Sequence, residues 1–276
     1  MSIQNFIPEV WAAEVQRALY AKAVFTRTPV TNRNYESIVG SGSEVKINQI
    51  GKITNAAYAG SVTYPEMDDA QRILKLDQKR YLGVKVPDID AFQANVELMS
   101  PAVQEMADSF TKTAETYVAS LYSDASITSA STGVTSGVVA FTAATAEQYF
   151  ADMMAAMGDA DVPMEGRWVV LPHWAYSRTI KALGAVVQVN NDILAQGALG
   201  RAYGFNIYAS SNVHNNGTNW DVMAGTSNAI TFADQINMME AFRDKDSFSD
   251  LLRGLRVYGA KVVRPDQLFW GIIKKA

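Results

Sequence analysis

The sequence of 276 residues contains no cysteine and only two histidines. Without cysteine there is no disulfide framework, no thiolate zinc site and no thiol nucleophile, so the stability of the fold has to come from packing or from partners. A surplus of positive charge is also missing, because 24 lysine and arginine residues stand against 28 aspartate and glutamate residues, for a net charge of −4. Neutralising many phosphates requires such a surplus. The composition therefore argues against sequence-specific binding of nucleic acids.

Long apolar runs are absent as well. No stretch reaches the length of about 18 apolar residues that a transmembrane helix needs. The start of the chain, Met1–Phe6, lacks the basic and apolar regions of a secretory signal. We expect no membrane partner and a soluble protein that is made and kept in the cytoplasm. Since 48% of the residues are hydrophobic, the chain can bury a substantial core, as one large domain or two smaller ones.

Signatures of catalysis are equally scarce. The nucleophile-elbow pattern is absent, and the glycine-rich stretch 197–204 matches neither a dinucleotide-binding nor a phosphate-binding fingerprint. His173 follows a predicted strand, a place where α/β enzymes carry catalytic residues, but no serine, cysteine or carboxylate pattern pairs with it. His214 lies in no metal-ligand spacing. We therefore favour a structural role for His173 and expect no catalytic residue.

Acidic pairs are the remaining candidates for a site, because carboxylate oxygens can hold a divalent cation. The pair at 88–90 precedes a predicted helix, where carboxylates cap free N–H groups, and the pair at 159–161 is typical of a helix-ending turn. Asn216–Thr218 is interpreted as a turn, although its residues match a glycosylation acceptor. We expect no metal and no cofactor. The pairs are Asp68 with Asp69, Asp88 with Asp90, and Asp159 with Asp161.

The first third of the chain predicts elongated pieces. A helix is expected from Pro8 to about Ala23, followed by an extended arm between Val24 and Gly42 that has little of its own to pack against. From Glu44 to Val86 apolar residues alternate, which predicts two long β segments joined by the polar stretch 55–69. A two-stranded hairpin of this length is marginal in water. Its apolar side chains need another surface, for which a neighbouring subunit is a candidate.

The middle of the chain carries the strongest helical signal. Apolar residues recur at a spacing of three and four from Ile89 to Leu121, and Ser100–Pro101 divides this run with a good N-cap and a good first helical residue. We predict a short helix at 89–98 and a long one at 101–122.

The last half of the chain predicts a compact α/β unit. The loop-like stretch from Ser123 to Ala146, with a short strand near 138–141, marks the expected domain boundary. Trp220–Phe232 favours paired strands around Gly225–Asn228, and the β-type runs of the tail are interrupted at Gly259 and Pro265. Between these parts we expect a helix at 146–158, a strand at 168–171, a helix at 172–183 and a strand at 206–209.

Several motifs, taken in order, resemble a known family. They are Asn5–Trp11, Gly42–Ile50, Tyr81–Asp90 followed by Gln93–Asn95, Gly204–Tyr208 with Ser211–Val213, and Tyr258–Pro265. In this order they are similar to segments of the coat proteins of tailed bacteriophages with the Hong Kong 97 type capsid fold, in the group related to the Salmonella phage coat protein. The resemblance spans most of the chain, and none of the motifs is a catalytic signature.

The resemblance implies an α+β fold of this type and a structural major capsid protein that self-assembles into the icosahedral head shell enclosing the phage genome. Pentamers and hexamers of the chain, scaffolding and portal proteins as partners, and packaged DNA contacted non-specifically at most would follow. The protein would reside in the virion after assembly in the host cytoplasm. The implied parts are an N-terminal arm (1–43), an extended loop (44–87), a peripheral domain with a long spine helix (88–145), an axial domain (146–226) and a return to the peripheral domain (227–276).

Two departures from the family pattern matter. No long scaffolding region precedes the first helix, so we expect a separate scaffolding protein or none, and the short axial domain leaves little room for an inserted domain. Some relatives crosslink a loop lysine to a neighbouring subunit, but nothing selects among the four loop lysines, and we predict no crosslink. An encapsulin-like nanocompartment shell and, from another class, a small α/β enzyme using His173 stay as alternatives. The loop lysines are Lys46, Lys52, Lys75 and Lys79.

Overall fold

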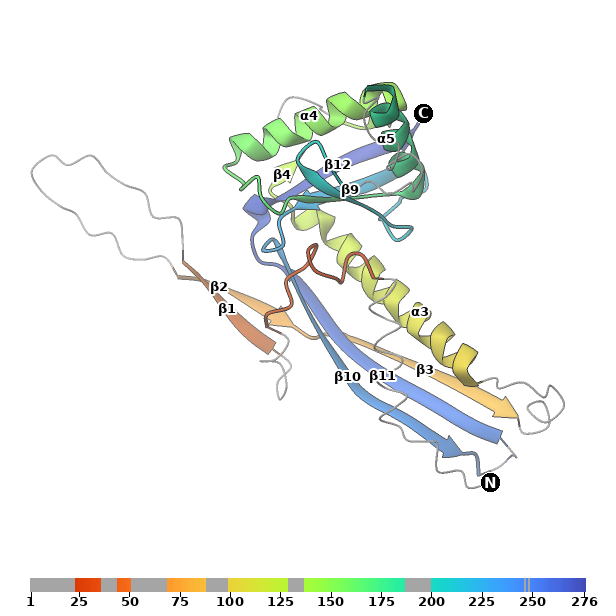
Figure 1. Ribbon diagram of the computed structural model, residues 1–276. Coiled ribbons are helices and arrows are strands. Elements are labelled where there is room, and N and C mark those ends of the chain that lie inside the picture. The colour runs from red at the N-terminus through yellow and green to blue at the C-terminus, as the bar shows by residue number, and fades with distance from the viewer. Residues whose placement is uncertain are drawn as a thin grey trace, which may run out of the picture.

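The computed structural model describes residues 23–35, 44–50, 69–87, 99–128, 137–186, 200–245, 247 and 249–276. These residues form two units (Figure 1). In the upper unit, helices cover a seven-stranded sheet, and in the long unit a single helix lies along a three-stranded sheet. Helices together with mostly antiparallel sheets confirm the predicted α+β class.

The upper unit is built on a sheet with the strand order β4-β12-β9-β6-β8-β7, in which β5 also pairs with β12. Its helices are α4 (Ala143–Asp159) and α5 (His173–Val186). Its strands are β4 (Ile127–Thr128), β5 (Val139–Phe141), β6 (Trp168–Leu171), β7 (Arg201–Ala202), β8 (Phe205–Ala209), β9 (Asn219–Gly225) and β12 (Leu268–Lys275).

The central strand β6 explains how this sheet is covered. All of its residues are buried, and the pleat turns successive side chains to opposite faces. Val169 and Leu171 join the core formed with α4 and α5, whereas Trp168 and Val170 join a second core shared with the long unit. A strand that is covered on both faces has an unbroken apolar sequence, which is the pattern that predicts a strand here.

The start and the end of α4 follow from its sequence. Thr142 and Thr145 form a capping box, in which Thr145 N–H donates to Thr142 Oγ1 at 3.1 Å and Thr142 N–H donates to Thr145 Oγ1 at 2.8 Å. Beyond the helix, Asp161 has a φ of 57°, a region that aspartate tolerates better than most residues, so the predicted helix-ending turn is confirmed. The expected succession of a helix, a strand, a helix and a strand is confirmed by α4, β6, α5 and β8.

The long unit combines one helix with long antiparallel strands in the order β10-β11-β3. The helix lies along one face of the sheet (Figure 1), where Tyr117 meets Tyr258 edge to face with 5.7 Å between ring centroids. The long helix predicted at 101–122 is confirmed, although its last residues form a 3₁₀ helix. The elements are α3 (Met99–Ala119), η2 (Ser120–Asp124), β3 (Gln78–Pro87), β10 (Ile230–Arg243) and β11 (Ser249–Val262).

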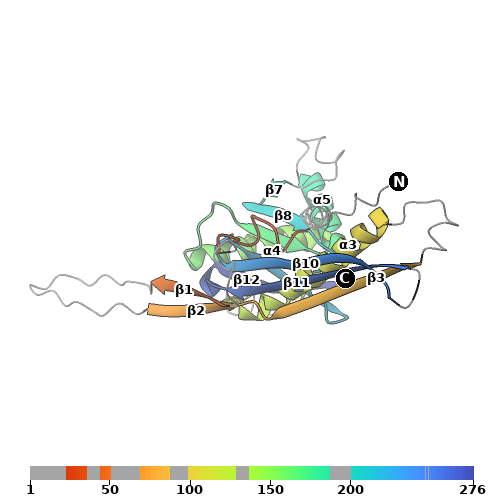
Figure 2. The same ribbon diagram turned by 90° about the horizontal axis from the view of Figure 1, so that it is seen from below.

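A hairpin of β1 (Glu44–Ile50) and β2 (Asp69–Lys75) projects away from both units (Figures 1 and 2). The prediction that its two long segments pair with each other throughout is wrong for the second half. β2 ends at Lys75, and from Gln78 the chain pairs with β11 as β3. The alternation of apolar residues fixes which face a side chain takes, but either partner strand satisfies it.

The predicted strand pair within Trp220–Phe232 is also wrong. β9 pairs with β6 and β12 in the upper sheet, whereas β10 pairs with β11 in the long sheet. The turn between them, in which Ala229 N–H donates to the Thr226 carbonyl at 3.0 Å, passes the chain from one sheet to the other. β11 runs through Gly259 without the predicted interruption, but the interruption at Pro265 is confirmed by the 3₁₀ helix η3 (Pro265–Gln267).

Some predicted elements lie outside the described residues. These are the first helix, the tip of the hairpin between β1 and β2, the short helix at 89–98 and much of the loop before β5. The short strand predicted near 138–141 is confirmed as β5.

The division of the chain into functional domains stays a prediction. The pairing of four strands differs from it. β4, β5 and β12 belong to the upper sheet, although β4 and β5 lie in the segment 88–145 and β12 lies in the segment 227–276, both assigned to the peripheral domain. β3 lies in the segment 44–87 assigned to the extended loop, but it pairs with β11 in the long sheet. Apolar runs of this kind predict strands without saying which sheet they enter.

The crossing of the hairpin over the long sheet depends on Gly259. A Cβ atom at this position would overlap the carbonyl of Lys75 and would approach the Cα of Leu76 to 3.0 Å. Both contacts are with backbone, at the corner where β2 gives way to β3, so neither can move away cheaply.

Gly259→Ala should therefore lower the free energy of unfolding by about 1–3 kcal/mol, the usual cost of overpacking. Urea unfolding followed by circular dichroism measures this loss. The matched control is Gly83→Ala in β3, where an added Cβ meets nothing within 4 Å. Equal stability of the two variants would contradict the close approach.

Candidate functional site

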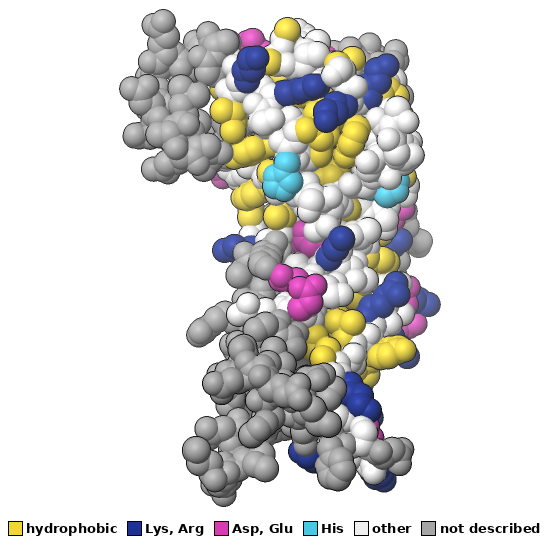
Figure 3. Space-filling view, turned by 90° about the vertical axis from the view of Figure 1, so that its right-hand side faces the viewer, with side chains coloured by type: hydrophobic (Ala, Val, Ile, Leu, Met, Phe, Trp, Pro, Cys, Tyr) yellow, Lys and Arg dark blue, Asp and Glu magenta, His cyan; other side chains and the backbone are white. Residues whose placement is uncertain are grey.

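The two histidines do not form a common site. In Figure 3 their side chains are separate on the surface. His173 is exposed at the first position of α5. His214 Nδ1 lies 2.6 Å from Asp221 Oδ2, and Trp270 Nε1 donates to Asp221 Oδ1 at 2.8 Å. His214 therefore takes part in a polar contact that fastens a loop to the sheet.

The same contact reaches the long unit through an aromatic ring. The Tyr122 ring of η2 lies 4.8 Å from the His214 ring and 5.0 Å from the Trp270 ring, between centroids. Burial, together with the charge of Asp221, raises the pKa of Tyr122. The resulting clasp of Tyr122, His214, Asp221 and Trp270 joins the upper unit to the end of the long helix. No pattern in the sequence indicates this clasp.

The other predicted candidates are turns or exposed positions. Asp159 and Asp161 are exposed at the end of α4. The predicted turn at Asn216–Thr218 is confirmed, because Asn216 Oδ1 accepts hydrogen bonds from Thr218 N–H at 3.2 Å and from Asn219 N–H at 2.9 Å. The acidic residues at 68, 88 and 90 lie outside the described residues. Across the described ranges, no group of three or more histidine, aspartate or glutamate side chains is placed to hold a metal ion. None of the described helices has the length and apolar character that spanning a bilayer requires.

The base of the projecting hairpin is covered by its own chain. Val45, Ile47, Leu74 and Leu76 are buried in a cluster with residues of β10 and β11, and Arg72 Nη1 donates to the Val262 carbonyl at 3.3 Å. At the base, the other surface that these side chains need is thus supplied by the same chain and not by a neighbouring subunit, the candidate named for it. The hairpin is attached to the long unit at its base, and its two strands run outward from there (Figure 1).

The segment 23–35, which we call the strap, also differs from the expected free arm. Phe25 and Val30 are buried in the core that the two units share. Asn32 extends the edge of β10, since its N–H donates to the Ile230 carbonyl at 2.8 Å and its carbonyl accepts from Phe232 N–H at 2.9 Å. The sequence of the strap has neither a helical nor a strand period. It therefore could not predict that the strap packs against distant elements.

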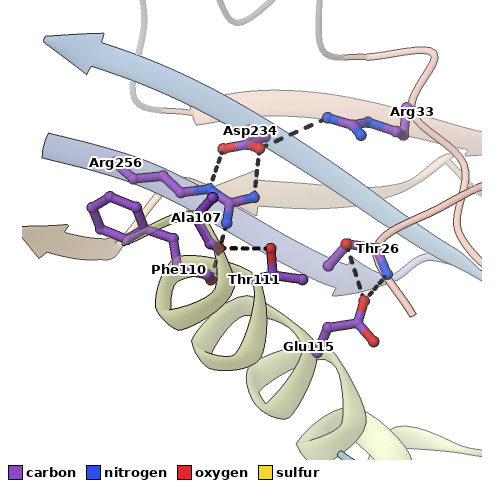
Figure 4. Close-up of polar contacts among 8 residues, drawn as sticks. All are labelled: Thr26, Arg33, Ala107, Phe110, Thr111, Glu115, Asp234 and Arg256. Carbon is purple, nitrogen blue, oxygen red and sulfur yellow. Dashed lines mark hydrogen bonds and ion pairs between the residues drawn. The ribbon is translucent and has the colours of Figure 1, made fainter. Parts of the chain in front are cut away.

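The strap is held by one buried carboxylate, that of Glu115 on α3 (Figure 4). Its Oε1 accepts from Val24 N–H at 3.1 Å, from Thr26 N–H at 2.8 Å and from Thr26 Oγ1 at 3.1 Å. Its Oε2 accepts from Phe25 N–H at 3.0 Å. Burial raises the pKa of Glu115, although these hydrogen bonds act in the opposite direction.

A second buried polar contact ties α3 to the long sheet (Figure 4). Arg256 on β11 donates to both carboxylate oxygens of Asp234 on β10, at 2.9 and 2.6 Å. Its third nitrogen, Nη1, donates to the Phe110 carbonyl at 3.0 Å. Arg33 of the strap adds a longer ion pair to Asp234 at 3.8 Å. Charged residues within apolar strands were the only sequence signal for this contact.

The face of the long sheet that points away from α3 carries exposed apolar side chains. Arg256 and its neighbours of the same parity face the helix, so Leu255 faces the other way, directly opposite Tyr81 of β3. Tyr81 is 80% exposed, Phe242 43% and Leu255 37%. Arg253 stacks over Phe242 with 4.9 Å to the ring centroid. Exposed large apolar groups gathered on one face are typical of a protein interface.

Comparisons with known proteins agree with this geometry. A family model described as phage capsid protein matches residues 44–271. The chain is similar to a structure from Mycobacterium phage Che8, with 27% identity, a TM-score of 0.76 and 91% of each chain covered. The capsid of cyanophage P-SCSP1u (15% identity, TM-score 0.65, 92% of this chain and 90% of that one) shares the fold. So does a virus-like particle from Pyrococcus furiosus (9%, 0.60, 96% and 98%). A search of curated protein sequences found no match.

Removing the carboxylate of Glu115 should release the strap. Glu115→Ala leaves three backbone N–H groups without their acceptor, and each unsatisfied buried donor costs about 1–3 kcal/mol. We expect a loss of at least about 3 kcal/mol in the free energy of unfolding, together with faster hydrogen exchange at Val24, Phe25 and Thr26. Thr116→Ala, an exposed neighbour on the same helix, is the control. A strap that stays protected in the Glu115 variant would refute its role.

The raised pKa of Glu115 also predicts how stability depends on pH. Because the folded state binds this proton more tightly than the unfolded state does, the contribution is fully present below the ordinary pKa of 4.5. It is lost as the pH rises through the folded pKa. The free energy of unfolding of wild type relative to Glu115→Gln should therefore fall as the pH rises above the ordinary pKa of 4.5. Denaturant unfolding of both proteins measures this difference, and a difference that does not change with pH would contradict the assignment.

Proposed function

Because this chain belongs to the phage capsid protein family and is a structural protein of the head shell, we propose that its copies assemble as pentamers and hexamers into an icosahedral capsid around the genome. The observation that carries this proposal is the combination of a projecting hairpin with an exposed apolar face on the long sheet. A contact between copies would bury the exposed apolar face.

Assembly of this kind rests on many modest contacts. Apolar area contributes about 25 cal/mol per Å² when it is buried, but association also costs translational, rotational and side-chain freedom. A single contact through Tyr81, Leu255 and Phe242 offsets this cost poorly. Several neighbours that engage together offset it well, because the loss of freedom is incurred once, and closure of the shell is then cooperative.

The expected partners follow from the same proposal. A separate scaffolding protein and a portal protein would complete the particle, which is assembled in the host cytoplasm. Packaged DNA is contacted non-specifically at most, since a net charge of −4 provides no general attraction for phosphates. An encapsulin-like shell is the less supported alternative. A neighbouring gene for an enzyme cargo, in place of portal and terminase genes, would favour it.

Electron microscopy of the expressed chain, alone and with its scaffolding protein, tests the proposal. Wild type should form closed shells, rings or tubes, and compact monomers under all conditions would contradict the proposed function. Ile50 and Asp69 are directly paired, so residues 51–68 can be replaced by Asn-Gly, a two-residue turn suited to a hairpin. This variant should unfold as cooperatively as wild type and form few shells. Loss of cooperative unfolding would show that the tip belongs to the core of the subunit.

A further inference from the structure

The two ends of the upper unit carry opposite charge. One end, which we call the basic end, consists of Arg178 and Lys181 on α5 with Lys274 and Lys275 at the end of β12. Arg178 donates to the carbonyls of Phe141 and Ala276, the latter at 3.0 Å, and so fastens α5 to the end of the sheet. The three lysines are exposed. Within the described part of the chain, no carboxylate pairs with them.

Figure 3 looks at this side of the molecule. Lysine and arginine side chains gather over its upper part with hydrophobic side chains between them, and the acidic side chains in view lie mostly lower, over the long unit. The apolar component includes the half-buried Trp174 and Trp220, whose rings meet at 5.0 Å. Arg178 lies over the Trp174 ring, 5.1 Å from its centroid. The basic end is thus a positively charged surface with an aromatic floor.

The acidic end lies where α4 terminates. Asp159, Asp161 and Glu165 are exposed there, and Met164 between them is 63% exposed. Arg167 does not neutralise them, because its guanidinium is buried and donates inward to the carbonyls of the turn, at 2.6 Å to Val162 and 2.9 Å to Pro163. The turn is therefore held rigidly, with carboxylates and a methionine directed outward.

The two ends are too far apart to satisfy each other. α4 begins beside Phe141, which receives the hydrogen bond of Arg178, and ends at Asp159 after 17 residues. At 1.5 Å per residue the helix is about 25 Å long. This distance exceeds the screening length of about 8 Å at physiological ionic strength. The charges of each end are consequently available to another molecule.

We propose that the basic end of one copy docks on the acidic end of the next copy, head to tail. This inference rests on the proposed function and names the contact that builds its rings. A heterologous contact between two different surfaces of the same chain generates a ring when the rotation closes. Opposite charges fix the register and speed the encounter. Met164 also suits the tryptophan floor, since thioethers pack favourably against aromatic rings.

A second copy fits these surfaces better than duplex DNA. DNA would engage the basic end alone, and the acidic end would repel it. A second copy uses both ends at once, and each end offers an apolar component, Met164 on one and Trp174 with Trp220 on the other, which phosphates do not need. The complementarity of the two ends, and not the presence of basic residues, carries the argument.

Charge reversal tests the contact. The basic-end variant is Lys181→Glu with Lys274→Glu, and the acidic-end variant is Asp159→Lys with Glu165→Lys, which leaves Asp161 unchanged because its φ is positive. Each variant places like charges face to face, so we expect about tenfold or greater loss of assembled particles in light scattering and microscopy. The chain with all four reversals restores opposite charges and should recover assembly. Lys112→Glu, an exposed reversal on α3, is the control, and thermal unfolding confirms that each variant folds.

The outcomes separate this inference from the proposed function. If wild type forms no oligomers, the proposed function fails and the contact fails with it. If wild type assembles but each reversed variant assembles equally well, or if the fourfold variant does not recover, only the contact is overturned. A basic-end variant that builds normal shells but retains less DNA would overturn it in favour of DNA binding.

Discussion

The long unit depends on the buried ion pair between Arg256 and Asp234. The pair joins neighbouring strands through two hydrogen bonds, and the remaining nitrogen of Arg256 reaches the Phe110 carbonyl on α3. Burying both charges has a desolvation cost, and removing either partner would leave an unpaired buried charge. The geometry therefore permits one position of the helix over the sheet. Glu115, farther along the same helix, extends this constraint to the strap, so the strap, α3, β10 and β11 are fixed relative to one another.

The face of the long sheet that points away from α3 has a different role from the face that α3 covers. The opposite face of the sheet is covered near the upper unit by the base of the hairpin, where Val257 joins its cluster, and is exposed farther along at Tyr81 and Leu255. The close backbone approach at Gly259 sets the place of this change. The base of the hairpin is buried against its own chain, so its direction relative to the long unit is fixed. In the proposed shell, this fixed direction determines where the hairpin meets a neighbouring copy.

Much of the fold was predictable because buried faces of helices and strands require apolar residues at regular spacings in the sequence. The spacing of three and four along α3 predicts a helix, and the short, valine-containing apolar run of β6 favours a buried strand. The sequence pattern does not show which strand pairs with which. For this reason β3 was predicted to pair within the hairpin and β9 was predicted to pair with β10. The functional surfaces divide in the same way. The motifs of the chain indicated a capsid protein, but the role of Glu115 depends on backbone groups of Val24 to Thr26, about ninety residues away, and no local pattern specifies backbone donors.

The net charge of −4 does not show that basic residues gather at one end of the upper unit and acidic residues at the other. If that polarity joins copies head to tail, the rotation between them depends on the angle between the two ends, which a rigid core of α4, α5 and β6 holds constant. Rings of five and of six copies need different rotations per copy, so the difference has to be absorbed outside this core. The junction of the upper and long units is not such a place, because the two units share a buried core that includes Trp168, Val170 and Tyr258. The two units then move as one body, and the difference in rotation has to be taken up at the contacts between neighbouring copies.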